Sequence, residues 1–310
     1  MSQTGGDRPL VSIVIATYNR WPMVGESVQS ALDQTLSERE VIVVDDGSTD
    51  GTTEHVRASY PAVRVVRQEN AERGVAYNHG IALARAPYVA FLDDDDVYEP
   101  WHLAQFAAAL SRRPDAQVFA SPAWFWDPVT GRRRLHEPFD PSTLAQDALR
   151  KTAIVPQMMV VAKSALLCAG GFPEERAVMG AEDWVLLIKL TRLYEIVPLE
   201  KPSLRIRVHA GRSVNDLPAS NRSREVATQR LLSEELAWLG LSDEERRVLV
   251  AGHLYALGHM QEARSRLRRV RRSLGWATGT RWTSRLWAQT WLGHRGSTVA
   301  RRLKSRVILR

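Results

Sequence analysis

The first hundred residues alternate between short apolar runs and segments in which apolar positions have helical spacing. Four runs rich in β-branched or aromatic residues predict parallel strands: Leu10–Ala16 and Val41–Val44, both expected to be buried, a short strand at Val63–Val66, and Tyr88–Leu92. Helical spacing predicts four helices: Met23–Leu32, Thr52–Ser59, Gly74–Ala84 and Glu99–Leu110. Strands and helices that alternate and are joined by short loops favour right-handed crossovers. The pattern therefore predicts an α/β fold with a mostly parallel central sheet flanked by helices.

Polar residues follow three of the predicted strands at the points where those strands end. The clusters are Thr17–Asn19, Asp45-Asp46 and Asp93–Asp96. Adjacent parallel strands end at the same edge of a sheet, and open α/β sheets bind ligands beyond that edge. We therefore expect the three clusters to converge on one site.

The four consecutive aspartates are the most distinctive of these clusters. Adjacent carboxylates repel one another unless a cation or several donors neutralise them. Carboxylate oxygens suit Mg²⁺ or Mn²⁺, and an extended chain would turn Asp93 and Asp95 to the same side. The alternative interpretation is an acidic loop that caps a helix.

The remainder of the chain is less regular. Val118–Trp126 and Arg132–Leu135 flank a turn sequence and predict a hairpin. Ala181–Thr191 is predicted to be a helix and Ser203–Val208 a strand, and the pattern is helical from about Ala219 onward. We expect a boundary near residue 215, between an α/β domain at 1–215 and a helical C-terminal region at 216–310.

Composition and charge narrow the class of protein. A chain of 310 residues with 44% hydrophobic and 25% charged residues is typical of a soluble globular protein. The lone Cys168, which we expect in the core, allows no internal disulfide, and the polar N-terminus lacks the apolar run of a signal peptide. These features predict a cytoplasmic location.

The charge is unevenly distributed. Residues 261–310 carry 14 Lys and Arg against one acid, Glu262, a charge of +13 against +7 for the whole chain, so the first 260 residues carry −6. Trp282, Trp287 and Trp291 fall near one helical face of this basic tail. That composition predicts peripheral contact with an anionic membrane surface, with a packed helix that has a basic outer face as the alternative. No motif predicts nucleic-acid binding.

Four segments in this order resemble those of family 2 glycosyltransferases of the GT-A group: Val11–Arg20 (VSIVIATYNR), Val41–Thr52 (VIVVDDGSTDGT), Tyr88–Asp96 (YVAFLDDDD) and Gly180–Trp184 (GAEDW). The resemblance covers about residues 9–215. It implies a GT-A-like fold with a nucleotide-sugar-binding half at about 9–115 and an acceptor half at about 116–215. It also implies transfer, with inversion, from a nucleoside diphosphate sugar, UDP-linked by expectation, to a glycan, a lipid-linked acceptor or a small molecule.

The resemblance places the donor nucleotide at the ends of the first two strands. Backbone groups of Ala16 and Thr17 and the ring of Tyr18, with Asn19 beside them, would hold the base, which an aromatic ring can stack on. Asp45 would accept a hydrogen bond from the base, with Asp46 as the alternative. One aspartate of this pair could instead serve a turn and helix cap.

The resemblance also implies a divalent cofactor, Mn²⁺ or Mg²⁺, bound by an Asp-x-Asp pattern. Asp95 would bind the metal, Asp93 the metal or the ribose, and Asp94 could take part in donor binding. His209 would reach the metal or the diphosphate, and Arg212 would contact phosphate.

One position departs from the family pattern. Many relatives have Ala-Arg-Asn where this chain has Ala76-Tyr77-Asn78, so the arginine is missing. Arg73 lies one helical turn earlier on the same face and is the expected substitute, with Asn78 retained as a donor-binding residue.

The resemblance implies that the Glu-Asp pair of the last segment is the acid–base site. Asp183 is the expected base, because burial beside Trp184 and an adjacent negative charge would raise the pKa of a carboxyl toward the operating range. Glu182 is expected to orient the acceptor or another side chain. The alternative is a pair of first-turn acids that stabilise a helix.

Three further residues are expected to line the acceptor cleft: Gln157, Met158 and Trp124. The remaining histidines, His136 among them, are expected at the surface or in packing.

A competing hypothesis for the whole chain is a catalytically degenerate GT-A module that binds a nucleotide sugar or docks on a membrane. A nucleotidyltransferase ranks lower, because Ala16–Trp21 contains no glycine.

Overall fold

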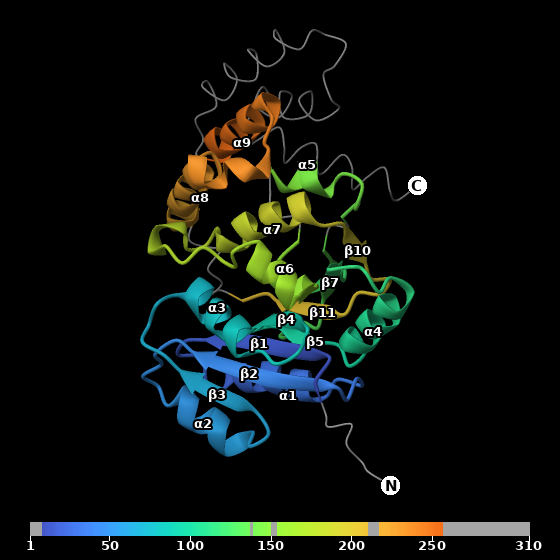
Figure 1. The fold of residues 1–310 in the computed structure, drawn as a ribbon. Coiled ribbons are helices and arrows are strands. Elements are labelled where there is room, and N and C mark those ends of the chain that lie inside the picture. The colour runs from blue at the N-terminus through green and yellow to red at the C-terminus, as the bar shows by residue number, and fades with distance from the viewer. Residues whose placement is uncertain (1–7, 137–138, 150–153, 210–216, 257–310) are drawn as a thin grey trace. The chain divides into compact units, whose positions relative to one another are not determined.

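The computed structural model describes residues 8–136, 139–149, 154–209 and 217–256 (Figure 1). The chain divides into two compact units, residues 1–227 and 228–310, which are described separately. In the described ranges, no helix combines the length and the apolar character that crossing a bilayer requires.

The first unit is built on a seven-stranded sheet with the order β10-β6-β9-β4-β1-β2-β3. All neighbouring pairs are parallel except those of β9, which runs antiparallel to β4 and β6. The strands are β1 (Val11–Thr17), β2 (Arg39–Asp45), β3 (Arg64–Arg67), β4 (Tyr88–Asp93), β6 (Val118–Ala120), β9 (Met159–Ala162) and β10 (Ile196–Pro198). The predicted mostly parallel sheet is confirmed.

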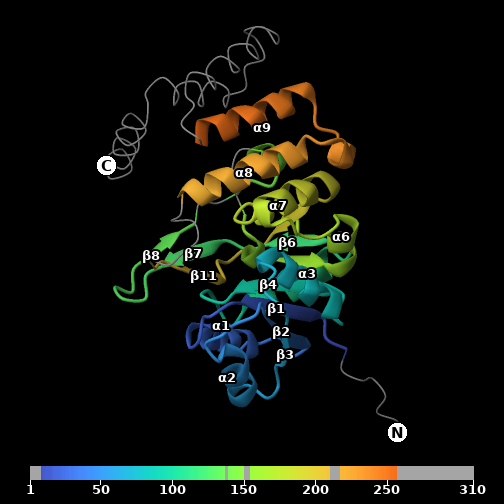
Figure 2. The same ribbon diagram turned by 90° about the vertical axis from the view of Figure 1, so that its left-hand side faces the viewer.

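The helices cover both faces of this sheet. Figures 1 and 2 show α1 (Met23–Leu32) and α2 (Thr52–Ser59) on one face and α3 (Arg73–Leu83) on the other. The bounds of α1 and α2 are those predicted. Helix α4 spans His102–Arg112 and begins later than expected, because the predicted first residue, Glu99, precedes Pro100 and is therefore disfavoured in the helical region.

A second sheet of four short strands has the order β5-β11-β7-β8. Its strands are β5 (Val97–Tyr98), β7 (Ala123–Trp126), β8 (Arg133–Leu135) and β11 (Leu204–Arg207). The predicted hairpin is confirmed as the antiparallel pair β7–β8, which projects from the first unit (Figure 2). The run predicted as one strand over Val118–Trp126 is instead divided between the two sheets at Pro122, which has no N–H for a ladder.

Shorter elements complete the first unit: α5 (Leu144–Ala148), the 3₁₀ turns η1 (Pro156–Met158) and η2 (Arg176–Val178), α6 (Lys163–Cys168) and α7 (Glu182–Leu193). Cys168 is exposed, so its predicted core position is wrong. It lies on the outward side of α6 beside exposed Leu167, while Ala165 and Leu166 are buried.

The described part of the C-terminal region is helical, as predicted. Helix α8 (Leu217–Leu231) crosses the boundary between the units, and the second unit contains the 3₁₀ turn η4 (Glu234–Leu239) and α9 (Asp243–Ala256). The basic tail lies outside the described residues, and the division near residue 215 stays a prediction.

Close packing of α3 on β1 fixes the position of the helix that reaches the site. All seven side chains of β1 are buried. A Cβ on Gly80 of α3 would lie 2.2 Å from Cγ1 of Val14, far inside van der Waals contact. Glycine at this position therefore lets the helix and the strand approach closely.

Substitution Gly80→Ala is expected to lower the free energy of unfolding by about 1–3 kcal/mol, because an added methyl overpacks a filled interface. The measurement is equilibrium denaturation by urea. Ala82→Ser, which adds one atom on the exposed side of the same helix, is the matched control and should change stability by less than about 0.5 kcal/mol. A Gly80→Ala protein as stable as the control would contradict this account of the contact.

Candidate active site

The carboxyl ends of β1, β2 and β4 meet at one edge of the central sheet. Ala16 pairs with Asp93 across β1 and β4, and Thr17 pairs with Asp45 across β1 and β2. A cavity of about 620 Å³ opens at this edge. The residues predicted to bind the donor or the metal or to act as acid and base, and that line it, are Ala16, Thr17, Tyr18, Asp46, Arg73, Asp93, Asp94, Asp95, Glu182 and Asp183. The expected convergence of the polar clusters is confirmed.

Three carboxylates gather at the end of β4. One oxygen from each of Asp93, Asp95 and Asp96 lies within 4.8 Å of the others. Asp95 accepts hydrogen bonds from Nε2 of His209 at 2.9 Å and from Arg20 at 3.3 Å. The donor set consists of carboxylate oxygens with an imidazole beside them, which fits a hard divalent cation such as Mg²⁺ or Mn²⁺.

Asp94 differs from its neighbours because it faces β1. Its Oδ2 accepts a hydrogen bond of 2.8 Å from the hydroxyl of Thr17. Burial raises the pKa of the Asp94 carboxyl to about 7, and the negative charges of Asp95 and Asp93 add to the rise against an opposing effect of Arg20. Asp94 therefore ties the aspartate run to the first strand.

Helix α3 supplies two side chains that reach Asp93. The Tyr77 hydroxyl donates to its Oδ1, and Nη1 of Arg73 lies 3.5 Å from its Oδ2. Residues four apart on a helix share a face. Tyr77 occupies the position of the missing arginine, and Arg73, four residues earlier, brings a positive charge to Asp93. Gln157 also donates to Asp93 through its side-chain amide.

Arg73 joins Asp93 to the Glu-Asp pair. Its Nε donates to Oε1 of Glu182 at 2.9 Å, and Glu182 is only 1% exposed. The negative charge of Glu182 raises the pKa of Arg73 further above its ordinary value, against the opposing effect of burial, and Asp93 adds to the rise. Glu182 is therefore held in a buried ion pair with Arg73.

Asp183 has the surroundings of a general base. It lies half-buried on the cavity wall in the first turn of α7, and its Oδ1 accepts a bond of 2.7 Å from the backbone N–H of Trp184. Burial raises the pKa of Asp183 to about 7, and the charge of Glu182 raises it further, while Arg73 acts in the opposite direction. A carboxyl with this pKa can take a proton near neutral pH.

The two aspartates at the end of β2 have different environments. Asp45 is fully buried and lies outside the cavity wall, because its oxygens accept bonds from the Ser48 backbone and the Thr53 hydroxyl at the start of α2. Asp46 lines the cavity, and its Oδ2 accepts a bond of 2.8 Å from the backbone N–H of Glu72. Asp45 thus serves the turn, and Asp46 is the aspartate of the pair that a ligand in the cavity can reach.

Asn19 and Asn78, both predicted to bind the donor, do not line the cavity. Asn19 adopts a positive φ of 51°, and its Oδ1 accepts from the Thr49 backbone at 2.7 Å. Asn78 exchanges hydrogen bonds of 2.9 Å with both backbone groups of Phe172 and so holds the loop before α7. Arg212 lies outside the described residues. Asn19 and Asn78 therefore hold neighbouring loops in place and do not themselves face the cavity.

The predictions for the acceptor side are met unevenly. Gln157 lines the cavity, whereas Met158 and Trp124 are absent from its wall. His136, expected at the surface or in packing, lines the cavity and lies 5.3 Å from Phe125 between ring centroids.

Other lining residues were not singled out from the sequence: Arg20, Asn70, Glu72, Phe125, Arg176 and Met179. Only Arg20, within the segment VSIVIATYNR, carried a sequence signal that could have found it.

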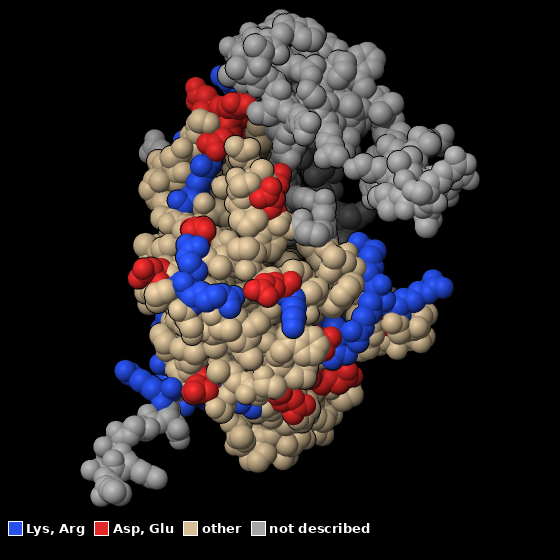
Figure 3. Space-filling model, turned by 90° about the vertical axis from the view of Figure 1, so that its right-hand side faces the viewer, with Lys and Arg blue, Asp and Glu red and all other residues tan. Residues whose placement is uncertain are grey.

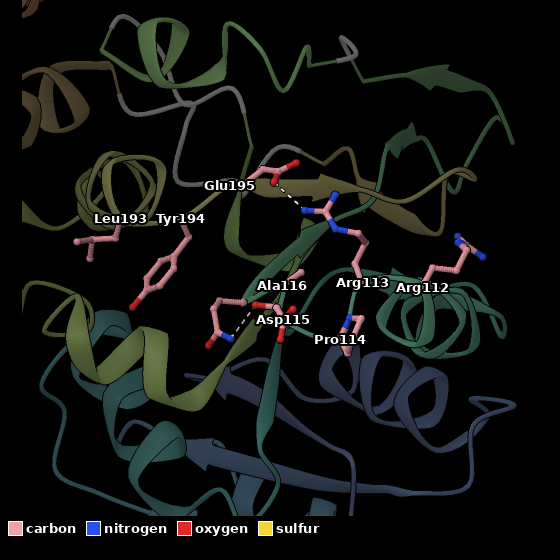
Figure 4. Close-up of a pocket in the computed structure, with 9 residues that line it drawn as sticks. Arg112, Arg113, Pro114, Asp115, Ala116, Leu193, Tyr194 and Glu195 are labelled. Atoms are coloured by element: carbon pink, nitrogen blue, oxygen red, sulfur yellow. Dashed lines mark hydrogen bonds and ion pairs between the residues drawn. The ribbon is translucent and has the colours of Figure 1, made fainter.

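A smaller pocket of about 390 Å³ lies where α4 and α7 end and β6 begins (Figure 4). Because β6 is in parallel alignment with β4, its amino end is at the opposite edge of the sheet from the carboxylate cavity. The ion pair between Arg113 and Glu195, at 2.8 Å, occupies the pocket wall. We therefore assign the candidate chemistry to the larger cavity.

Comparison with known proteins agrees with this location. The family model described as "Glycosyl transferase family 2" matches residues 12–167, about half of the chain. Chondroitin synthase of Escherichia coli is 45% identical over 96 residues, which are 30% of this chain and 14% of that protein. The first four curated relatives are matched over only 14–30% of their own length.

Two solved structures share the fold at low sequence identity. TarS of S. aureus in complex with UDP-GlcNAc has a TM-score of 0.59 at 20% identity, over 79% of this chain and 72% of that one. The mannosyltransferase PcManGT of Pyrobaculum calidifontis, in complex with GDP-Man and Mn²⁺, has a TM-score of 0.55 at 21% identity, over 94% and 81%. The expected GT-A-like fold is confirmed.

Mn²⁺ is expected to raise the midpoint of thermal unfolding, because a cation that binds only the folded aspartate cluster stabilises it by about 2.7 kcal/mol at roughly 100 times its Kd. Differential scanning fluorimetry with and without a chelator measures the shift. Asp95→Asn should reduce it, and Asp115→Asn, an exposed residue of the smaller pocket, should leave it unchanged. Equal shifts in all three proteins would rule out binding at Asp95.

Proposed function

The chain belongs to glycosyl transferase family 2, and we propose that it transfers a sugar from a UDP-linked donor to an acceptor hydroxyl, with inversion at the anomeric carbon. One observation carries the proposal. The aspartate cluster at the end of β4 and the half-buried Asp183, whose pKa is raised to about 7, line the same cavity.

The nucleotide would lie against the ends of β1 and β2. Tyr18 is 47% exposed on the cavity wall and can stack on a base. Among the described residues, Oδ2 of Asp46 accepts one hydrogen bond and retains a lone pair for a ring N–H. TarS, seen with UDP-GlcNAc, and PcManGT, seen with GDP-Man, support a nucleoside diphosphate sugar as the donor class.

Asp93, Asp95 and His209 would hold a divalent cation, for which Mn²⁺ in the PcManGT structure is the precedent. When bound, the ion supplies Lewis-acid stabilisation of the charge on the departing nucleoside diphosphate. Arg20 lies 3.3 Å from Asp95 on the same wall and can turn its guanidinium toward phosphate oxygens.

Asp183 would remove the proton from the acceptor hydroxyl while that oxygen attacks the anomeric carbon. Glu182 stays paired with Arg73 and keeps the start of α7 in place, since it also accepts a bond from the backbone of Gly180. A single base beside the donor site suits one direct displacement, which inverts the anomeric centre.

Three features of the chain stay predictions from the sequence: the cytoplasmic location, contact of the basic tail with a membrane, and the domain boundary near residue 215. The hexose identity of the transferred sugar belongs to the same proposal.

Titration of the purified chain with UDP, GDP and dTDP tests the donor site. We expect UDP to bind in the presence of Mn²⁺ and to bind at least tenfold more weakly without it, because the cation would screen the aspartates from the diphosphate. Isothermal titration calorimetry gives the affinities. GDP binding alone would overturn the uridine assignment, and failure of all three diphosphates would favour the degenerate module.

Asp183→Asn is expected to lower the rate of transfer by about 10²–10⁴, the usual contribution of a general base, while UDP affinity stays within about twofold. In the wild type, activity should fall tenfold per pH unit as the pH drops below about 7. The pKa of Asp183 is raised to about 7, so below that pH the carboxyl is protonated and cannot accept the proton of the acceptor hydroxyl. Glu182, Arg73, Asp93 and Arg224 are the charged groups that act on it.

Asp115→Asn is the matched control for that experiment. It should keep the wild-type rate of transfer and the same fall in activity below about pH 7. Transfer that survives Asp183→Asn at the wild-type rate, or a pH profile flat from 5 to 8, would show that another group is the base.

A further inference from the structure

One face of the second sheet runs from the cavity onto the hairpin of β7 and β8. Ile206 of β11 pairs with Phe125 of β7, and Phe125 pairs with Arg134 of β8. Directly paired residues project from the same face of a sheet, so the three side chains form one row. Ile206, Phe125 and His136, which lies two residues beyond Arg134, line the cavity. The row therefore brings Arg134 to the rim of the cavity.

The positive charge of Arg134 has no carboxylate partner in the described parts of the chain. Its guanidinium carbon lies 4.5 Å from the centroid of the Phe125 ring, and the side chain is exposed. The neighbouring Arg133 points to the other face and lies 3.5 Å from Glu99. Figure 3 shows Lys and Arg side chains gathered along the protruding hairpin at the right-hand edge. A planar cation fixed on an aromatic ring and open to solvent is suited to bind an anion.

We propose that the acceptor is an anionic glycan, and that Arg134 binds a carboxylate or phosphate on the sugar chain while the reactive hydroxyl lies at Asp183. This inference rests on the proposed function, because it names the acceptor class of the same site. Phe125 and His136 line the cavity next to Arg134 and would contact sugar C–H groups there, and the guanidinium forms paired hydrogen bonds with carboxylate or phosphate oxygens.

The position of the arginine explains why the anion binds at the rim. Deeper in the cavity, Asp93 to Asp96, Glu182 and Asp183 would repel a negative group that no cation screens. A lipid surface matches the hairpin less well, since interfacial binding requires exposed bulky apolar side chains. The aromatic side chains of β7, Trp124 to Trp126, are only half-exposed, and the exposed large apolar residues of the hairpin are Val129, at 92%, and Leu135, at 38%.

The test is a titration of the full chain with three tetrasaccharides, with and without UDP and Mn²⁺. Two are anionic, tetragalacturonate and phosphorylated maltotetraose, and maltotetraose is the neutral reference. We expect at least one anionic probe to bind about fivefold more tightly than the reference, with an advantage that falls as salt rises. Arg134→Gln should abolish the tighter binding of the anionic probe. Arg134→Lys should retain part of it, because lysine keeps the positive charge but lacks the planar guanidinium that forms paired hydrogen bonds.

Arg112→Gln is the matched control, because Arg112 is an exposed arginine of the smaller pocket (Figure 4), and it should leave the preference intact. Equal binding of all three saccharides, no binding of any, or a preference that survives Arg134→Gln would each overturn the proposal. Phosphatidylglycerol vesicles provide the other arm: binding that Arg134→Gln removes for vesicles but not for the anionic saccharides would assign the arginine to a membrane instead.

The outcome is separable from that of the proposed function. Nucleoside diphosphate binding depends on the aspartate cluster, whereas the saccharide preference depends on Arg134. UDP binding with no saccharide preference would reject only the acceptor class, and a preference without UDP binding would reject only the donor site.

Discussion

Repulsion among carboxylates is the constraint around which this site is organised. Asp93 to Asp96 follow one another at the end of a buried strand, and four more acids line the same cavity: Asp46, Glu72, Glu182 and Asp183. Folding can place them together only because donors come from distant segments: Thr17 from β1, Tyr77 and Arg73 from α3, and the backbone of Arg207 at the end of β11. The elements that surround the cavity are thus linked through the charges they neutralise.

The same constraint gives each acid a different task. Glu182 is neutralised by Arg73 and becomes part of the framework, whereas Asp183, one residue later, keeps a raised pKa and an open side toward the cavity. Asp45 and Asp46 divide in a similar way, one bonded into the turn before α2 and the other facing the cavity. Adjacent acids therefore have different roles, because donors of the protein already bind the carboxylate oxygens of one and leave the other facing the cavity.

The sequence predicts much of this arrangement because the relevant information is local. Apolar runs and helical spacing locate β1, β2 and β4, and parallel strands must end at one edge, so the aspartate cluster and Tyr18 converge. The i, i+4 rule is also local and correctly brings Arg73 to the site. The sequence could not decide which of Asp45 and Asp46 faces the cavity, because that depends on where α2 begins. Nor could it place His136 or Phe125, since these reach the cavity through the pairing of β7 with β11, about eighty residues apart in the chain.

The bridge made by Arg73 couples the two halves of the cavity energetically. One guanidinium is shared between Asp93, at the end of the fourth strand, and Glu182, at the start of α7. A ligand that changes the charge at Asp93 changes how strongly Arg73 holds Glu182, and therefore changes the electrostatic surroundings of Asp183, the next residue in the chain. Such coupling is reciprocal for equilibrium binding: whatever factor the first ligand applies to the affinity of the second, the second must return to the first. In this cavity, a single side chain therefore links the aspartate cluster at the end of β4 to the Glu-Asp pair at the start of α7.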